Sequence, residues 1–290
     1  MEHGKWMRTR WIIALAGACV LAALWPESGR TQAQKWAGCG DPTPEEQHFL
    51  ECLNAARADP AGAQTRLKTD LTAGGKFQMT PRHPLVMNCL LTEAARRHSR
   101  AMNDQAFFGH LNPEGQGPGV RLRAAGYKWR GYSENLAAAA TTPMEALANL
   151  LIDEGIPDLG HRVSLLGLTE QTRPMDEVGI GIHTGSGPYK KYYTIELATD
   201  PDPGVFLTGV VYRDTNKNNL YDPGEGLPSI KVEVTAEGVT AVTNRAGGYG
   251  IPIDLPGSLV VTASGAGMAG PMQKAINLTN TNAKLDFTTR

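Results

Sequence analysis

The apolar positions of residues 41–199 fall at helical spacing in most segments and at strand spacing near the end. Helical periodicity, with Pro and Thr at helix starts and Gly at helix ends, predicts helices over residues 41–58, 85–104 and 118–125, after Thr142, and over 160–167. Short runs of β-branched and aromatic residues predict two strands, at 178–182 and 192–195. Interleaved helices and strands indicate a mixed α and β domain.

The pattern changes after residues 200–204, an Asp-, Pro- and Gly-rich stretch that we interpret as a linker. Residues 205–290 alternate apolar and polar positions in short runs, with turn residues between them and no helical stripe. They predict an all-β sandwich of about seven strands, at residues 206–212, 230–234, 239–243, 249–253, 259–263, 275–278 and 283–287. The predicted fold class is α+β, with one domain at 41–199 and a second at 205–290.

The first 33 residues are typical of a secretory signal peptide. Lys5, Arg8 and Arg10 precede an apolar run over residues 11–25, and small residues follow, which predicts cleavage near Ala33. A run of about 15 residues is short for a membrane span. A retained anchor and a lipoprotein signal at Cys19 are the alternatives. We expect a secreted or periplasmic mature chain without a transmembrane span.

Composition and charge narrow the class of protein further. Hydrophobic residues make up 41% of the 290 residues, enough for a packed core, which excludes wholesale disorder. Lys and Arg number 28 against 29 Asp and Glu, so we expect no nucleic acid partner.

The cysteines of the mature chain favour a single disulfide bond. Cys39, Cys52 and Cys89 remain after signal cleavage, which leaves one thiol free in an oxidising compartment. Three pairings are possible. Cys39 with Cys52 is the least favoured, because Cys52 lies about two turns inside a helix that begins after Cys39.

Three motifs between residues 95 and 182 occur in a fixed order. A helix carrying Ala95–Ser99 leads to Phe108-Gly109-His110; Tyr132–Ala137 reads YSENLA; and Gly160-His161-Arg162 precedes a Gly-Ile-Gly-Ile strand. This set resembles the CAP superfamily of cysteine-rich secretory, antigen 5 and pathogenesis-related 1 domains, in particular its bacterial SCP-like branch. The resemblance covers residues 45–199 and implies an α-β-α sandwich with a central cleft.

The resemblance also implies a set of cleft residues. It places two histidines, His110 and His161, with Glu134 and a second acid in the cleft. We prefer Asp153 to Glu154 as that acid, because it lies three residues after Leu150, on the inward side. Imidazoles and carboxylates suit zinc or a similar divalent ion, and they could also act without a metal. We expect His98, on the same stripe as Met102, to be a core histidine.

Residues 214–225 fit the twelve-position calcium loop. Asn219 stands at position 6 in place of Gly and tolerates a positive φ angle. The donors come from six positions: the side chains of Asp214, Asn216, Asn218, Asp222 and Glu225 and the carbonyl of Leu220. The alternative is a plain polar turn. With few charges around the ion we expect a calcium Kd of about 10⁻⁴–10⁻³ M.

The calcium loop and the sequence after it resemble an SdrD B-type (Cna B-like) domain. The likeness rests on residues 214–232 and on Thr243–Tyr249, and it covers 205–263 best. It implies a transthyretin/Ig-like sandwich that serves as a calcium-rigidified spacer or adhesive module.

We expect a binding or surface-interaction protein rather than an enzyme. The ligand implied is a lipid, a protein or a cell-wall component. The alternative is a metal-dependent extracellular hydrolase of peptide or cell-wall material, but the sequence contains no GxSxG or HExxH motif, and no spacing marks Ser99 or Ser133 as a nucleophile. A structural protein with a vestigial cleft is a third possibility.

Overall fold

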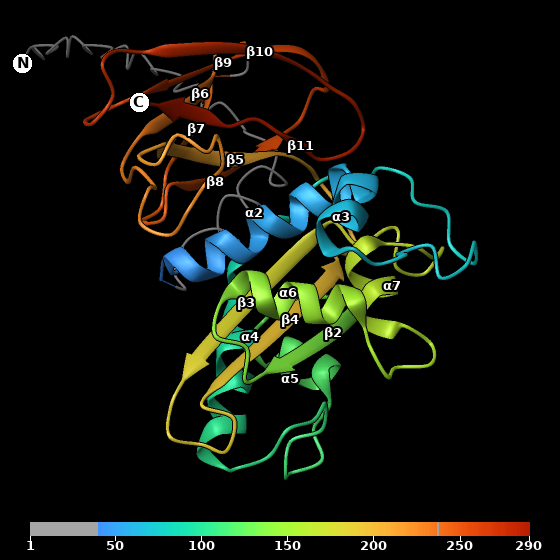
Figure 1. Ribbon diagram of the computed structural model, residues 1–290. Helices are drawn as coiled ribbons and strands as arrows, with labels where there is room; N and C mark the ends of the chain where they lie inside the picture. Colours follow the sequence, from blue (N-terminus) through green and yellow to red (C-terminus); the bar gives the residue numbers. More distant parts are fainter. Residues whose placement is uncertain (1–39, 237) are drawn as a thin grey trace, which may run out of the picture.

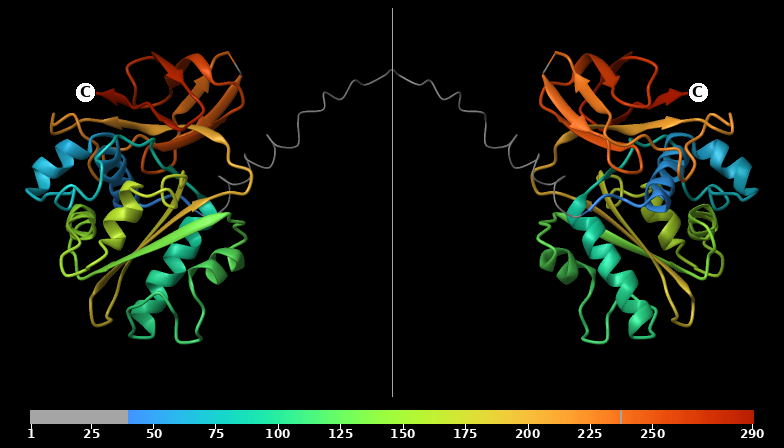
Figure 2. Two further views of the ribbon diagram at one scale, coloured as in Figure 1. Left: turned by 90° about the vertical axis from the view of Figure 1, so that its right-hand side faces the viewer. Right: turned by 90° about the vertical axis from the view of Figure 1, so that its left-hand side faces the viewer.

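The computed structural model describes residues 40–236 and 238–290 in two stacked parts. The N-terminal region, residues 40–199, contains all the helices of the described chain, and the C-terminal region, residues 205–290, consists of strands. The C-terminal region lies against helix α2 (Pro44–Ala58) (Figures 1 and 2). The predicted signal peptide, residues 1–33, lies outside the described residues, as does Cys39.

One four-stranded sheet forms the centre of the N-terminal region. Its order is β1-β3-β4-β2, and only β1 and β3 run parallel. The strands are β1 (Val86–Met87), β2 (Gly131–Ala138), β3 (Glu177–Thr184) and β4 (Lys191–Thr199). β2 is therefore an edge strand of this sheet.

Helices cover both faces of this sheet (Figure 1). Besides α2 they are α3 (Pro60–Leu67), α4 (Cys89–Asp104), α5 (Pro118–Ala124), α6 (Pro143–Ile152) and α7 (Gly160–Leu166). α2, α6 and α7 share a core with alternate residues of β3 and β4, including Val178, Ile180, Tyr193 and Ile195. α4 and α5 lie on the opposite face. The result is three layers, helix, sheet and helix.

α4 approaches its face of the sheet unusually closely because β3 has glycines there. A Cβ atom at Gly179 would lie 2.1 Å from the carbonyl carbon of Leu91, and one at Gly181 would lie 2.3 Å from that of Ala95. The Ser99 hydroxyl donates to the Gly181 carbonyl at 2.8 Å. The Gly-Ile-Gly-Ile pattern thus places glycines toward α4 and isoleucines toward the other core.

The C-terminal region contains two sheets around one hydrophobic core. One sheet has the order β10-β9-β6-β7; in the other, β5 pairs with β11, β12 and β8. Leu207, Val232, Ile251, Val261 and Phe287 belong to the shared core. The strands are β5 (Val205–Arg213), β6 (Lys231–Val234), β7 (Val239–Val242), β8 (Gly248–Ile253), β9 (Gly257–Ser264), β10 (Met272–Leu278), β11 (Ala283–Lys284) and β12 (Phe287–Thr289).

The elements differ from the sequence-based predictions in a few places. α3, β1 and β2 were not predicted, and the predicted strand at 283–287 is divided into β11 and β12. The division arises because Asp286 Oδ1, rather than a backbone carbonyl, accepts from the backbone nitrogen of Val210 at 3.0 Å.

Cys52 is a free thiol, so two of the three possible disulfide pairings are not formed. The third, Cys39 with Cys89, includes a residue outside the described range and stays a prediction.

No helix within residues 40–236 and 238–290 combines the length and the apolar character needed to cross a membrane.

Candidate functional site

Glu134 and His110 form the first pair of the site. Glu134 lies in β2, opposite Glu196 of β4, and its side chain faces α4 with only 1% exposure. The Nδ1 atom of His110 lies 2.7 Å from Glu134 Oε1 and donates to it, while the His110 side chain is 53% exposed. Because Nδ1 is occupied, Nε2 is the nitrogen that His110 can offer to a ligand.

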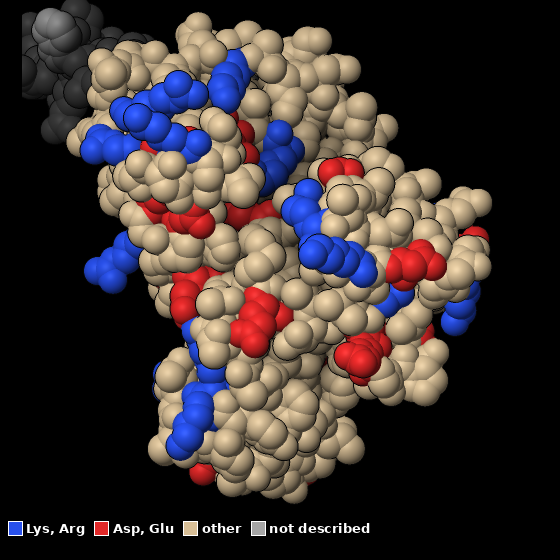
Figure 3. All heavy atoms as spheres, viewed as in Figure 1, with Lys and Arg blue, Asp and Glu red and all other residues tan. Residues whose placement is uncertain are grey.

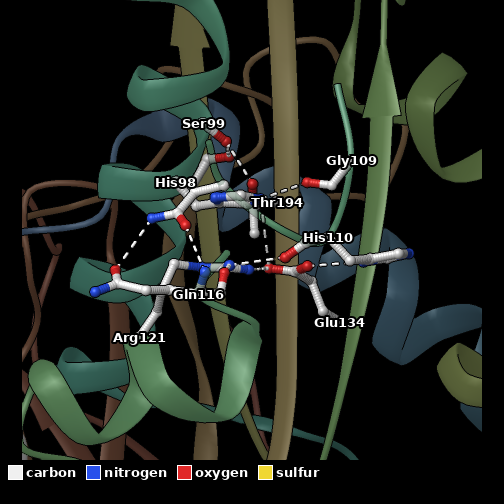
Figure 4. Close-up of polar contacts among 10 residues, drawn as sticks. His98, Ser99, Gly109, His110, Gln116, Arg121, Glu134 and Thr194 are labelled. Atoms are coloured by element: carbon white, nitrogen blue, oxygen red, sulfur yellow. Dashed lines mark hydrogen bonds and ion pairs between the residues drawn. The ribbon is translucent and has the colours of Figure 1, made fainter. Parts of the chain in front are cut away.

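Arg121 of α5 fixes this pair in place (Figure 4). Its guanidinium forms an ion pair with Glu134 Oε2 and donates to the carbonyl oxygens of His110, at 2.8 Å, and Gln116, at 2.7 Å. The same side chain therefore neutralises the buried carboxylate and ties down both ends of the 110–116 loop.

His98 of α4 lies beside Glu134 on the buried side of the Glu134–His110 pair. Its Nε2 lies 3.0 Å from the Gly109 carbonyl oxygen and 3.8 Å from Glu134 Oε2, and its ring is buried. Burial lowers the pKa of His98, and the Glu134 charge opposes this only in part, so the ring is neutral near pH 7. His98 is a buried histidine as predicted, but it also contacts the site.

The two carboxyl groups of the cluster have opposite pKa shifts. Burial raises the pKa of Glu134, but hydrogen bonds with His110 and Glu196, helped by the neighbouring Arg121 charge, outweigh it, so the net shift of the pKa is downward. Burial and the neighbouring Glu134 raise the pKa of Glu196 well above its ordinary value. Of the two carboxyl groups, Glu134 is therefore the one that favours the ionised form, and Glu196 is the one on which burial and the Glu134 charge favour a proton.

Asp153 and His161 form a second pair with the same geometry. Asp153 follows the last residue of α6 with a φ angle of 56°, and its Oδ1 accepts from His161 Nδ1 at 2.7 Å. Its Oδ2 accepts from the backbone nitrogen of Arg162 at 3.1 Å. The His161 side chain is 25% exposed, and Glu154 points to solvent. Of the two acids considered, Asp153 is the one that contacts a histidine.

The edge strand β2 also contacts α7, the helix that carries His161. Ser164 of α7 contacts Ser133 Oγ at 2.7 Å and accepts from Asn135 Nδ2 at 3.0 Å. Ser133 and Asn135 point to the face opposite Glu134, since side chains alternate along a strand. α7, the helix that carries His161, therefore contacts the face of β2 opposite Glu134.

Within residues 40–236 and 238–290, no group of three or more His, Cys, Asp and Glu side chains is positioned to hold a metal ion. The contacts that the structure gives for the four predicted residues are two histidine–carboxylate pairs, His110 with Glu134 and His161 with Asp153. The predicted zinc set of His110, Glu134, Asp153 and His161 stays a prediction.

Comparison with known families decides what this region is. The cysteine-rich secretory protein family, CAP, matches residues 50–197. The chain belongs to the CAP family. The four predicted cleft residues, His110, Glu134, Asp153 and His161, all lie within this matched range.

Solved structures resemble the chain only distantly. An extracellular protein containing a SCP domain from Bacillus anthracis str. Ames has 22% identity and TM-score 0.35, covering 53% of this chain and 41% of its own. An outer surface protein from Borrelia burgdorferi has 14% identity and TM-score 0.32, and the match covers 49% of this chain and 93% of that protein. A cysteine-rich secretory protein from Staphylococcus aureus subsp. aureus Mu50 has 15% identity and TM-score 0.34, with coverages of 54% and 40%. No curated protein matches the chain. The chain spans about two fifths of the first and third of these structures.

Sequence reasoning missed two residues of the CAP site. Arg121 lies on a predicted helix, and nothing in its spacing distinguishes it from a solvated arginine. Glu196 lies at an alternate position of the strand after Thr194, a face that the two-residue period could have identified as buried. Buried acids in strands are rare enough to be a useful signal.

The predicted calcium loop follows β5 directly. The buried Asp214 carboxylate accepts from the backbone nitrogens of Asn218 and Asn219, each at 3.1 Å, and Asn219 has a φ angle of 60°. Glu225 accepts from the backbone nitrogens of Thr215, at 2.8 Å, and Asp222, at 3.1 Å. The loop therefore folds back on itself, with its first and last acids bonded to its own backbone.

The other predicted calcium ligands of this loop lie close to one another and are joined by hydrogen bonds. The side-chain amides of Asn216 and Asn218 donate to Asp222 Oδ2 at 2.8 and 2.7 Å. The backbone nitrogen of Leu220 donates to Asn218 Oδ1 at 2.7 Å. Hard oxygen donors in one short loop are the chemistry that Ca²⁺ requires.

Proposed function

We propose that this chain is an extracellular binding protein of the CAP family, exported after signal cleavage near Ala33. The supporting observation is that His110 and His161 each have Nδ1 fixed by a nearly unexposed carboxylate and Nε2 left to face a ligand. Carboxylate-oriented imidazoles bind hydrogen-bond donors or a divalent ion such as zinc.

The surroundings of His110 favour an amphipathic ligand, either a lipid or a protein surface. Phe108 and Leu111, on the loop that carries His110, are 43% and 63% exposed. Tyr189, from the β3–β4 hairpin, is 44% exposed and lies 5.5 Å from the Phe108 ring. Charges of both signs are scattered over the face in Figure 3, and its lower part is mostly uncharged apart from a run of Lys and Arg along its left side. Exposed apolar side chains grouped in this way are typical of interaction sites.

The serines of this region favour binding over hydrolysis. Ser99 is buried and donates to the Gly181 carbonyl, and its hydroxyl also contacts Thr194 at 2.8 Å. The Ser133 hydroxyl forms a hydrogen bond with the Ser164 hydroxyl. Both hydroxyls have partners and neither contacts a histidine, which a serine nucleophile requires.

The C-terminal region is proposed to be a transthyretin/Ig-like sandwich of the SdrD B-type that binds calcium. The ligands are the side-chain oxygens of Asp214, Asn216, Asn218, Asp222 and Glu225 and the carbonyl of Leu220. In an extracellular fluid with millimolar calcium, a weak site of this kind is occupied and keeps the loop rigid.

A binding panel tests the function. Phosphatidylcholine vesicles, an apolar peptide and insoluble peptidoglycan are each mixed with the mature protein. We expect one of them to bind, and Phe108→Ser with Leu111→Ser to weaken that binding at least about tenfold. Leu255→Ser, at a position 72% exposed in the C-terminal region, is the control. Release of soluble fragments from peptide or peptidoglycan would instead support the hydrolase alternative.

A further inference from the structure

Helix α2 connects the two parts of the chain. Its inner face, with Phe49, Leu50 and Leu53 at most 1% exposed, belongs to the CAP core. Its outer face contacts the C-terminal region through His48 and Glu51, which lie three residues apart and so on the same side of the helix. A change in the C-terminal region can therefore act on the CAP core through this helix.

The first contact is made by the calcium loop itself. Nδ1 of His48 lies 3.0 Å from the carbonyl oxygen of Tyr221. Tyr221 stands between two predicted calcium ligands, Leu220 and Asp222. Its ring is only 5% exposed, with ring centroids 6.3 Å from His48 and 6.0 Å from Tyr212 of β5. Tyr221, which contacts α2, is thus covalently joined on both sides to residues proposed to bind the ion.

The second contact is an ion pair behind the loop. Lys284 Nζ of β11 lies 2.7 Å from Glu51 Oε2 and also pairs with Asp286. Asp286 Oδ1 accepts from the backbone nitrogen of Val210 in β5, the strand that ends at the calcium loop. Both contacts of α2 therefore converge on β5 and its loop.

We propose that calcium binding to the 214–225 loop and docking of the C-terminal region on α2 are thermodynamically coupled, so that calcium stabilises the CAP domain. The coupling rests on the calcium site proposed above. An ion held by the Leu220 carbonyl and the Asp222 carboxylate fixes the Tyr221 peptide between them in the position that His48 contacts. A looser loop would lose that contact and weaken the docking.

Coupling of this kind is reciprocal. If calcium strengthens docking by some factor, then the fully undocked chain binds calcium more weakly than the docked chain by the same factor, typically about 5- to 150-fold. The prediction is specific, since neither His48 nor Glu51 is a proposed ligand of the ion.

Calorimetric titration of the mature chain with calcium alone tests the proposal. We expect His48→Ala and Glu51→Gln to weaken calcium binding at least about fivefold, and His48→Gln, which keeps a donor, to restore part of it. Glu93→Gln, which removes an exposed ion pair with Arg97 on α4, is the matched control and should leave the affinity unchanged.

Tryptophan fluorescence gives a second readout. The tryptophans that remain in the mature chain are Trp36 and Trp129, so the C-terminal region contains none and the signal reports the N-terminal region. Calcium should raise the Tm of wild type measured by this signal, and raise it less in His48→Ala. Calcium binding equal to wild type in both interface variants overturns the coupling alone. A wild type that binds no calcium at millimolar concentration overturns the calcium site together with the coupling.

Discussion

The carboxylate of Glu134, 1% exposed, accepts from Nδ1 of His110, 53% exposed, at 2.7 Å. A buried charge therefore sets the orientation and the tautomer of a surface imidazole. The arrangement recurs at Asp153 and His161, where the distance is also 2.7 Å. Two elements far apart in sequence thus present the same chemical group, an imidazole Nε2 supported by a carboxylate from behind.

Glu134→Gln should destabilise the protein by about 3 kcal/mol, because it leaves the nearly buried Arg121 guanidinium without its counter-charge. Urea unfolding at pH 7 measures the change. Glu93→Gln, at an exposed ion pair, should change the free energy of unfolding by less than about 0.5 kcal/mol. A loss below about 1 kcal/mol for Glu134→Gln would show that Arg121 finds another partner.

Asp176 should make stability fall as pH rises from about 4 to about 7. Burial and the neighbouring Glu177 raise its pKa to about 7 in the folded protein. Between the unfolded and folded pKa values the unfolded chain has already lost a proton that the folded chain keeps, so ionisation favours unfolding. Asp176→Asn should therefore match wild type near pH 4 and exceed it in stability at pH 8. Urea midpoints at the two pH values check this, and parallel curves for both proteins would contradict it.

Gly179→Ala should destabilise the CAP domain by about 3 kcal/mol or more, because the new Cβ would lie 2.1 Å from the backbone of Leu91. Gly131→Ala is the matched control in β2, where an added Cβ meets no atom within 4 Å. Thermal unfolding of both variants measures the difference. Equal Tm values would mean that α4 can move away from the sheet without cost.

Asp214→Ala should abolish the calcium-dependent rise in Tm, since Asp214 supplies position 1 of the proposed calcium loop and accepts from two backbone nitrogens of the loop. The comparison is made in millimolar calcium and in chelator. A Tm rise in Asp214→Ala equal to that of wild type would exclude this loop as the site.

The sequence predicted the helices well where local signals were strong. Thr43 caps α2 with Glu46 at N3, and Thr142 accepts from the backbone nitrogen of Glu145, as the capping patterns indicate. β2 was missed because its Ala-rich end favours a helix by propensity, and pairing with β4 overrides that preference. Local preference is a weak guide where one edge strand is completed by distant residues.

The pairing within the site was harder to predict than its residues. The family resemblance selected His110, Glu134, Asp153 and His161, but it does not say which of these side chains contact one another. That depends on the register of β2 against β4, a long-range contact. The roles of Arg121 and Glu196 depend on the same register, since both act through Glu134.

The tautomers of His110 and His161 test the central claim most directly. Long-range ¹H–¹⁵N correlation spectra at pH 7.5 distinguish a proton on Nδ1 from one on Nε2. The account predicts a proton on Nδ1 of both rings, loss of this signature for His110 in Glu134→Gln, and shifts of both Nε2 resonances when ligand or zinc is added. A proton on Nε2 of both rings in the wild type, unaffected by Glu134→Gln, would contradict it.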